Sequence, residues 1–276
     1  MTPPKKENGF SKLPNHSTAD SRLPEFKALI VENSLLNEFS YEDEFLLKFL
    51  RARDYKPKEA CDLLNAYVSM IQQRPDLFTW SSNLRKVLDS KIHRICKSRR
   101  TDGGAIGVIA AKNWDPNEVD PIELFQLIIT ADETEVLDPE IQEKGFHTVI
   151  DASDVTLYQI YRFGVSGGRL ISELGDKILP VNVRKIHIIY ENRLVDIGYN
   201  LFKPFLSEDF KQRIIFHGKN LEDLKGCCPS SALPPDFGGT GKDDYTTDER
   251  LQRFEKQRST IEKLWNQFKL PKKSED

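Results

Sequence analysis

The chain has 276 residues, 38% of them hydrophobic, which is enough to enclose one sizeable core or two modest ones. Its 40 basic and 43 acidic side chains leave a net charge of -3, which argues against a general nucleic-acid-binding protein. No apolar run approaches the roughly 18 to 20 residues that span a bilayer, and the start, MTPPKKENGFSKLPNHSTADS, lacks the apolar core of a secretory signal, so we expect a cytoplasmic protein.

The first part of the chain is predicted to be helical. Residues 1–20 are polar and are expected to form a disordered tail. From residue 21 to about 90 the apolar residues recur at helical spacing, as in EDEFLLKFLRA, and Pro57 stands near the first turn of a further helix. We therefore expect an all-helical N-terminal unit over residues 21–90.

The second part is predicted to be an α/β domain, over residues 91–240. Short apolar runs typical of strands occur at 105–112, 146–151, 185–190 and 213–217, and helical stretches at 121–138, 155–179 and 193–206 separate them. This alternation predicts a mostly parallel sheet covered by helices. Residues 241–276 are expected to form a C-terminal helix, about 247–268, and a tail. The basic run KIHRICKSRR (91–100) is expected to be solvated, although its spacing is also compatible with a helical face for an anionic membrane.

Cysteine and histidine positions give little indication of a metal site. None of the four cysteines belongs to a C-x-x-C pair, so reduced structural thiols are expected. His147, His187 and His217 lie in or next to apolar strands, where a hydrogen-bonded core histidine is commoner than a ligand. We therefore expect no metal and no cofactor.

The segment Gly164-Val165-Ser166-Gly167-Gly168 matches the G-x-S-x-G nucleophile elbow of serine hydrolases. An elbow needs a strand before the serine, yet the residues on both sides have helical spacing. The glycines are therefore expected to separate two helices, with Ser166 as the N-cap of the second. A hydrolase that uses Ser166, with His217 as its base, stays a remote alternative, and no catalytic residue is predicted.

Several landmarks together resemble the CRAL-TRIO lipid-binding family. They are the EFLLKFLRARDYKPKEACDLL lead-in (44–64), Trp114-Asp115-Pro116, the KPFLSE segment and the LPPDFGG close (233–239). Within the family the chain resembles the branch of the alpha-tocopherol transfer protein and cellular retinaldehyde-binding protein. The resemblance runs from about residue 25 to 240 and implies a CRAL-TRIO fold that encloses a hydrophobic ligand.

The helix expected at 193–206 has an apolar face that includes Leu194, Leu201 and Phe202. From periodicity alone it is an ordinary amphipathic helix packed on a sheet. The resemblance implies a gate instead, which covers an apolar cavity and opens at a membrane.

The resemblance also implies pocket-lining positions, which are Phe125, Ile128, Asp132, Leu174, Leu179 and Ile186. Periodicity alone assigns most of them to the core, and Asp132 to solvent or an ion pair. Ile128 and Asp132 stand where the tocopherol protein has small hydroxyl residues, a departure that puts tocopherol itself in doubt.

A phosphoinositide site beside the gate is implied at four basic positions: Arg53, Arg184, Lys211 and Arg213. Two further positions that look like lysine in the tocopherol protein are Asn182 and Asp209 here, so the site is only partly retained. Ordinary solvated surface charge is the alternative.

Taken together, the sequence predicts an intracellular carrier, not an enzyme, that encloses one hydrophobic small molecule of the retinoid, tocopherol or carotenoid class. It is expected to act at membrane surfaces, to meet phosphoinositides there, and to bind no nucleic acid. A phospholipid or phosphoinositide exchange protein of the same fold is the alternative.

Overall fold

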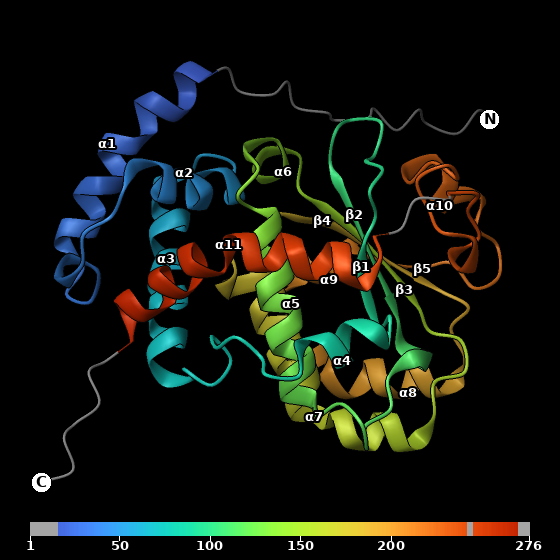
Figure 1. Cartoon of the computed structure of the whole chain (residues 1–276). Coiled ribbons are helices and arrows are strands. Elements are labelled where there is room, and N and C mark those ends of the chain that lie inside the picture. Colours follow the sequence, from blue (N-terminus) through green and yellow to red (C-terminus); the bar gives the residue numbers. More distant parts are fainter. Residues whose placement is uncertain (1–15, 242–244, 270–276) are drawn as a thin grey trace, which may run out of the picture.

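The computed structural model describes residues 16–241 and 245–269, with side chains described from Ser21 onward (Figure 1). Helix α1 (His16–Glu32) begins inside the predicted tail, and residues 1–15 of that tail lie outside the described part. The N-terminal helical unit continues with the short η1 (Leu36–Glu38), α2 (Asp43–Ala52) and α3 (Pro57–Gln73). Pro57 occupies the first turn of α3, where its missing N–H is not needed.

The second unit contains a five-stranded sheet. Its strands are β1 (His93–Ile95), β2 (Ala105–Ala110), β3 (Phe146–Asp151), β4 (Val183–Ile189) and β5 (Ile214–Phe216), and they lie side by side in chain order. Strand β1 is antiparallel to β2, whereas β2 to β5 are parallel. The prediction of a mostly parallel sheet is therefore confirmed.

Helices connect the parallel strands. Helices α5 (Pro121–Glu135) and α6 (Pro139–Lys144) link β2 to β3, whereas α7 (Leu157–Glu173) and the π-helical turn η3 (Leu174–Ile178) link β3 to β4. Strands β4 and β5 are joined by α8 (Arg193–Phe202), η4 (Lys203–Phe205) and α9 (Glu208–Arg213). Because the strands follow in chain order and such crossovers are almost always right-handed, these connections cover one face of the sheet.

The two faces of the sheet have separate cores. Ala105 and Phe146 pack on the face covered by the connecting helices, in a cluster that includes Phe125 of α5. The neighbouring residues Ile106 and Val149 point the other way, because side chains alternate along a strand. On that side they pack against α10 (Glu222–Cys227) and η5 (Pro235–Phe237).

Helix α11 (Thr247–Phe268) joins the two units. It contacts α3 of the first unit and α5 of the second, as well as α4 (Leu84–Asp89), which lies between them in the chain (Figure 1). Thr246 begins the helix with a capping box, in which its hydroxyl accepts from Glu249 N and Glu249 accepts from Thr246 N. At the other end, Trp265 and Phe268 are buried in the aromatic cluster of the N-terminal unit.

The basic run at 91–100 is neither a solvated segment nor a helical face. Its centre forms β1, and Arg94 and Arg100 are each only 8% exposed. Arg94 pairs with Asp236 at 2.5 Å and lies over the ring of Phe237, whereas Arg100 pairs with Asp102. This short strand with charged residues is stabilised by partners far along the chain. The spacing of its own residues therefore could not predict that it is a strand.

Candidate functional site

Helix α8 lies at the surface with both of its sides partly accessible. Asn192 caps its N-terminus by accepting hydrogen bonds from Leu194 N at 2.9 Å and Val195 N at 3.3 Å. None of its ten residues is fully buried. The predicted gate residues fall on different sides, since Leu194 and Phe202 are half-buried whereas Leu201 is 46% exposed. A helix with this exposure is held by few contacts.

Glycines of α7 let α8 approach closely. A Cβ at Gly168 would lie only 2.6 Å from Phe202 Cβ, closer than real side chains allow. Gly198 of α8 is packed less closely against α7, because a Cβ at this position would lie 3.9 Å from Ile160. Gly168 is thus explained by packing, since Phe202 of α8 occupies the space that a side chain at this position would need.

Ser166 is not placed as a nucleophile or as a helix cap. Helix α7 bends at Gly164, whose φ of 62 is outside the helical range, and helix precedes and follows the bend. Because no strand leads into Ser166, the elbow geometry is absent. Since the non-helical residue lies two positions earlier, Ser166 is in the first turn after the bend, exposed, and the prediction that it is the cap was wrong.

The predicted pocket-lining residues lie on the helix-covered side of the sheet. Phe125, Leu174 and Leu179 are buried members of one apolar cluster, and the ring of Phe125 lies 5.9 Å from that of Phe163. Ile128 and Ile186 are half-buried. Phe125, Leu174 and Leu179 thus share one cluster, whereas Ile128 packs against a second cluster that includes Trp114 and Phe254.

Asp132 is the polar member of this set. Burial raises the pKa of its carboxyl to about 8, and the nearby carboxylates of Glu133 and Glu135 add to the effect. Its side chain keeps some accessible surface even though protein surrounds it. At neutral pH the protonated form is therefore favoured, and Asp132 can donate a hydrogen bond.

The four predicted phosphoinositide residues are only partly gathered, and acidic or backbone groups engage all of them. Arg53 donates to Asp176 O at 2.8 Å, and its pKa is lowered by burial and by nearby Arg213. The other three form ion pairs, which are Arg184 with Asp54 at 3.4 Å, Lys211 with Glu208 at 2.6 Å, and Arg213 with Asp209. Asp209, which departs from the tocopherol protein's pattern, thus neutralises a member of the set.

An apolar surface runs over α7 and α8. Leu157, Tyr161 and Val165 of α7 are 65%, 79% and 43% exposed, and Ile197 and Phe205 on the α8 side are 52% and 37% exposed. Leu157 and Tyr161 are one turn apart on α7, and Ile197 and Leu201 are one turn apart on α8, so each pair shares a face of its helix. Phe205 also lies under the guanidinium of Arg169 of α7. We call Leu157, Tyr161, Val165, Ile197, Leu201 and Phe205 the apolar stripe. Among the described helices, none is long and apolar enough to cross a membrane.

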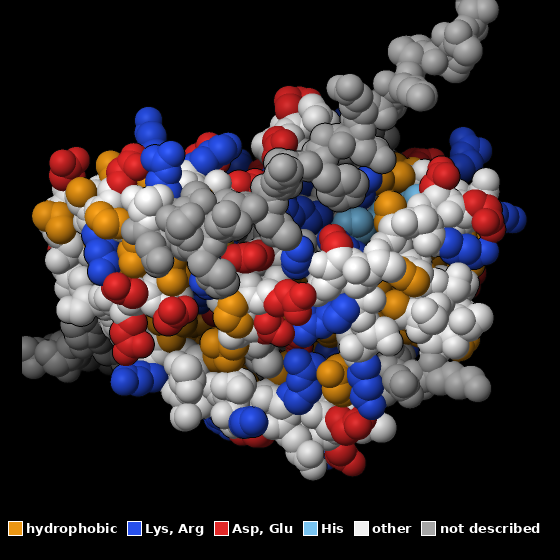
Figure 2. All heavy atoms as spheres, turned by 90° about the horizontal axis from the view of Figure 1, so that it is seen from above, with side chains coloured by type: hydrophobic (Ala, Val, Ile, Leu, Met, Phe, Trp, Pro, Cys, Tyr) orange, Lys and Arg blue, Asp and Glu red, His pale blue; other side chains and the backbone are white. Residues whose placement is uncertain are grey.

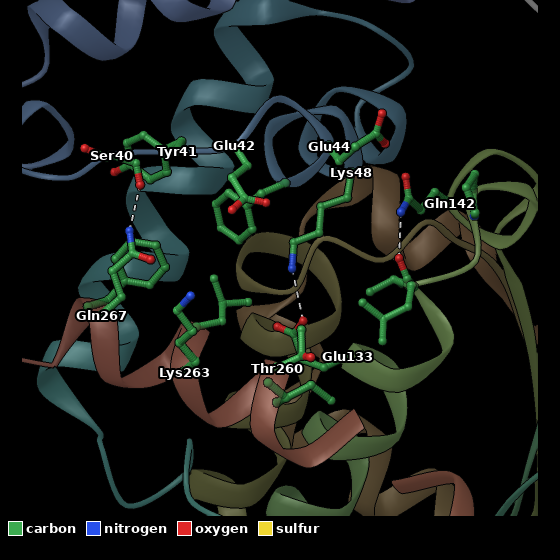
Figure 3. A pocket seen from close by; sticks show the side chains of 17 residues that line it. Ser40, Tyr41, Glu42, Glu44, Lys48, Glu133, Gln142, Thr260, Lys263 and Gln267 are labelled. Atoms are coloured by element: carbon green, nitrogen blue, oxygen red, sulfur yellow. Dashed lines mark hydrogen bonds and ion pairs between the residues drawn. The ribbon is translucent and has the colours of Figure 1, made fainter. Parts of the chain in front are cut away.

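A separate cavity of about 720 Å³ lies between α2, the end of α5, α6 and α11 (Figure 3). Lys48 points across it toward Glu133, with Nζ 3.0 Å from the carboxylate, and Tyr67 donates to the same carboxylate at 2.6 Å. At its rim Gln267 donates to Ser40 O at 2.7 Å. No predicted site residue lines this cavity. The one sequence signal for it was a lysine inside the apolar run FLLKFL.

Comparison with known proteins gives consistent matches. The CRAL/TRIO domain model matches residues 93–239, and the CRAL/TRIO N-terminal domain model matches residues 23–66. Clavesin-2 of Rattus norvegicus is 30% identical over 233 residues, which is 82% of this chain and 70% of clavesin-2. Clavesin-1 of Xenopus laevis is 27% identical over 245 residues, 87% of this chain and 74% of clavesin-1. The crystal structure of Sfh5 covers 91% of this chain and 100% of its own with a TM-score of 0.54; at 12% identity it shows a shared fold.

Proposed function

Because the chain belongs to the CRAL-TRIO family, whose members bind and transfer lipids, we propose that it carries one hydrophobic small molecule beneath helix α8 and releases it at membranes. The observation that carries this proposal is that α8 is rich in apolar residues, yet none of its ten residues is fully buried. A helix of an ordinary core buries such a face. A helix that moves away from the domain to open a cavity must not be fully buried, and α8 meets this condition.

The ligand proposed is of the retinoid, tocopherol or carotenoid class. Support comes from the apolar residues Phe125, Leu174 and Leu179, which pack in one cluster, and from Asp132 on the same helix as Phe125. A protonated Asp132 favours a ligand with one hydrogen-bond acceptor, such as a hydroxyl or carbonyl oxygen, over one with a charged headgroup. A phospholipid exchange protein of the same fold is the alternative, since a phospholipid also has apolar chains to enclose.

Docking on a membrane is proposed to use the apolar stripe. Its six side chains are already between 37% and 79% exposed to water. Each 100 Å² of this surface that enters the lipid interface offers about 2.5 kcal/mol, at ~25 cal/mol per Å² of apolar area. Movement of α8 toward the bilayer then uncovers the layer beneath it without any bond being made or broken.

A contact with phosphoinositide headgroups is the finer part of the proposal. Arg53 and Arg213 lie near one another, and paired phosphate oxygens are suitable acceptors for two guanidinium groups. Each arginine would exchange a present partner for phosphate. We therefore expect the protein to bind phosphoinositide membranes modestly more tightly than neutral membranes.

The experiment that tests the carrier has two parts. Native mass spectrometry of the protein purified from cells should detect one bound lipid, and the class of that lipid decides between a small hydrophobic molecule and a phospholipid. In the second part, Leu201→Asp should weaken binding to phosphatidylcholine and phosphatidylserine vesicles about tenfold, because a charge must enter the interface. The matched control is Val31→Asp, which changes a residue that is 70% exposed on α1. Equal binding by the two variants would contradict docking through the stripe.

A further inference from the structure

Three histidine side chains form a hydrogen-bonded row on the face of the sheet opposite the proposed lipid layer. His147 is on β3, His187 on β4, and His217 directly follows β5. His187 Nε2 lies 3.1 Å from His147 Nδ1, and His187 Nδ1 lies 2.9 Å from His217 Nε2. Adjacent parallel strands present alternate side chains to the same face, which places the three rings in a row.

Two cysteines at the end of α10, Cys227 and Cys228, lie beside this row of histidines. One donor atom each from His147, His187 and Cys227 can be chosen so that all lie within 4.8 Å of one another. Cys228 Sγ is 3.9 Å from His147 Nδ1. Both ligating histidines are buried, whereas Cys227 is partly accessible. Figure 2 shows histidine atoms at the surface beside lysine and arginine side chains; of the three histidines, His217 is the partly exposed one.

Neutral imidazole is the form that binds metal, and the contacts between the rings decide which nitrogen carries the proton. The nearby cations are Arg100, which pairs with Asp102, and Lys185. Two ring-to-ring hydrogen bonds in a row of neutral imidazoles need one N–H each, so His187 can donate from Nδ1 and leave its Nε2 lone pair facing His147.

We propose that His147, His187 and Cys227 bind a divalent cation of the zinc class on the face of the sheet opposite the lipid layer. In a tetrahedral zinc site with metal–nitrogen distances of about 2.0–2.1 Å, two nitrogens lie roughly 3.3 Å apart. The 3.1 Å between the ring nitrogens of His147 and His187 already matches this value. Thiolate and imidazole together select zinc over magnesium or calcium.

The protons balance on binding. The Nδ1 proton of His147 moves to Nε2 of the same ring, so this imidazole stays neutral. The thiol of Cys227 loses its proton to solvent, and one proton is released for each cation bound. His187 keeps its Nδ1 proton and donates it to His217, an outer-shell contact that fixes the ring for coordination. The fourth position is left for water.

This site is separate from the proposed lipid site. Ile186 faces the connecting helices whereas His187, the next residue, faces α10, because side chains alternate along β4. The cation would tie α10 to the central strands. It should therefore raise the temperature of unfolding of the protein without altering the rate of lipid transfer.

Titration of the metal-free, reduced full chain with Co²⁺ tests the assignment. A thiolate-to-cobalt charge-transfer band should appear in the near ultraviolet and should be displaced by Zn²⁺. Cys227→Ser should remove this band, and the matched variant Cys228→Ser should keep it. His217→Gln should weaken the affinity about 10- to 100-fold, the effect expected of an outer-shell residue. Far-ultraviolet circular dichroism checks that each variant is folded.

Absence of the band in the unaltered protein would overturn the proposal. So would a band that survives Cys227→Ser, or one that Cys228→Ser removes. Because Cys227 is partly accessible, its replacement by serine is tolerated by the core more readily than that of a buried histidine. The test therefore does not depend on the histidine variants being stable.

Discussion

Replacing Gly168 by alanine should loosen α8 without unfolding the protein. The added Cβ would lie 2.6 Å from Cβ and 2.8 Å from Cδ1 of Phe202, so the helix that carries Phe202 must shift. Overpacking of this kind costs typically 1–3 kcal/mol. The same change removes a glycine from the interior of α7, which stabilises that helix by up to about 1 kcal/mol. The closed position of α8 is thus destabilised while the rest of the fold is not.

The expected result is a roughly 5- to 150-fold increase in the hydrogen-exchange rate of the α8 amides, since 1–3 kcal/mol corresponds to that range. Release of NBD-labelled tocopherol, or of NBD-phosphatidylcholine if only that lipid loads, should accelerate by a similar factor. Amide exchange measured by mass spectrometry needs no ligand, so it tests how firmly α8 packs against α7 independently of lipid binding.

Gly198→Ala provides the matched control, because it adds the same methyl group to the same interface. Its Cβ would meet Ile160 at 3.9 Å, an ordinary contact, and alanine favours the helix. Exchange in α8 should stay unchanged or slow down. Unaltered exchange in a folded Gly168→Ala protein would refute the claim that the contact between Gly168 and Phe202 holds α8 closed.

Three further predictions concern the charged residues Asp132, Lys48 and Asp209. Asp132 has a folded-state pKa of about 8, above its ordinary 3.8, so its contribution is present at low pH and is lost as pH rises toward 8; urea unfolding should show Asp132→Asn to be the more stable form at about pH 8.5 but not at about pH 5. Lys48→Met should lower the free energy of unfolding by about 3–5 kcal/mol in urea titrations, because it leaves the buried carboxylate of Glu133 without its cation. Asp209→Asn should free Arg213 and strengthen binding to phosphoinositide vesicles about fivefold in co-sedimentation, with no gain on neutral vesicles.

The sequence predicts the parallel strands and their helices well. Runs such as FHTVID are rich in apolar and β-branched residues, and β3 spans that run, Phe146–Asp151. Strand β1 was missed because its residues are not apolar as a group. Arg94 of this strand is held by Asp236 and Phe237, which are more than 140 positions away. Such partners leave no periodic signal near the strand.

Prediction of the candidate site from the sequence was less complete. Periodicity identified the apolar residues of α8, but it did not indicate that Phe202 faces inward while Leu201 faces water. That distinction depends on where α7 lies, and hence on the missing side chain of Gly168. Likewise, the Lys48 pair with Glu133 joins residues 85 positions apart. Proximity of this kind arises from the tertiary fold.

The position of α11 has a consequence for the order in which the protein can be completed during synthesis. Phe268 lies within 6.3 Å, ring centre to ring centre, of Phe39, Tyr41, Phe45 and Tyr67, and Trp265 packs edge-on against Phe78. These partners belong to the first third of the chain, yet a ribosome releases α11 after every other described helix. Until then the N-terminal unit exposes an aromatic surface with no cover, a state prone to aggregation. Nascent chains of this protein are therefore expected to depend on chaperones until the last helix has emerged.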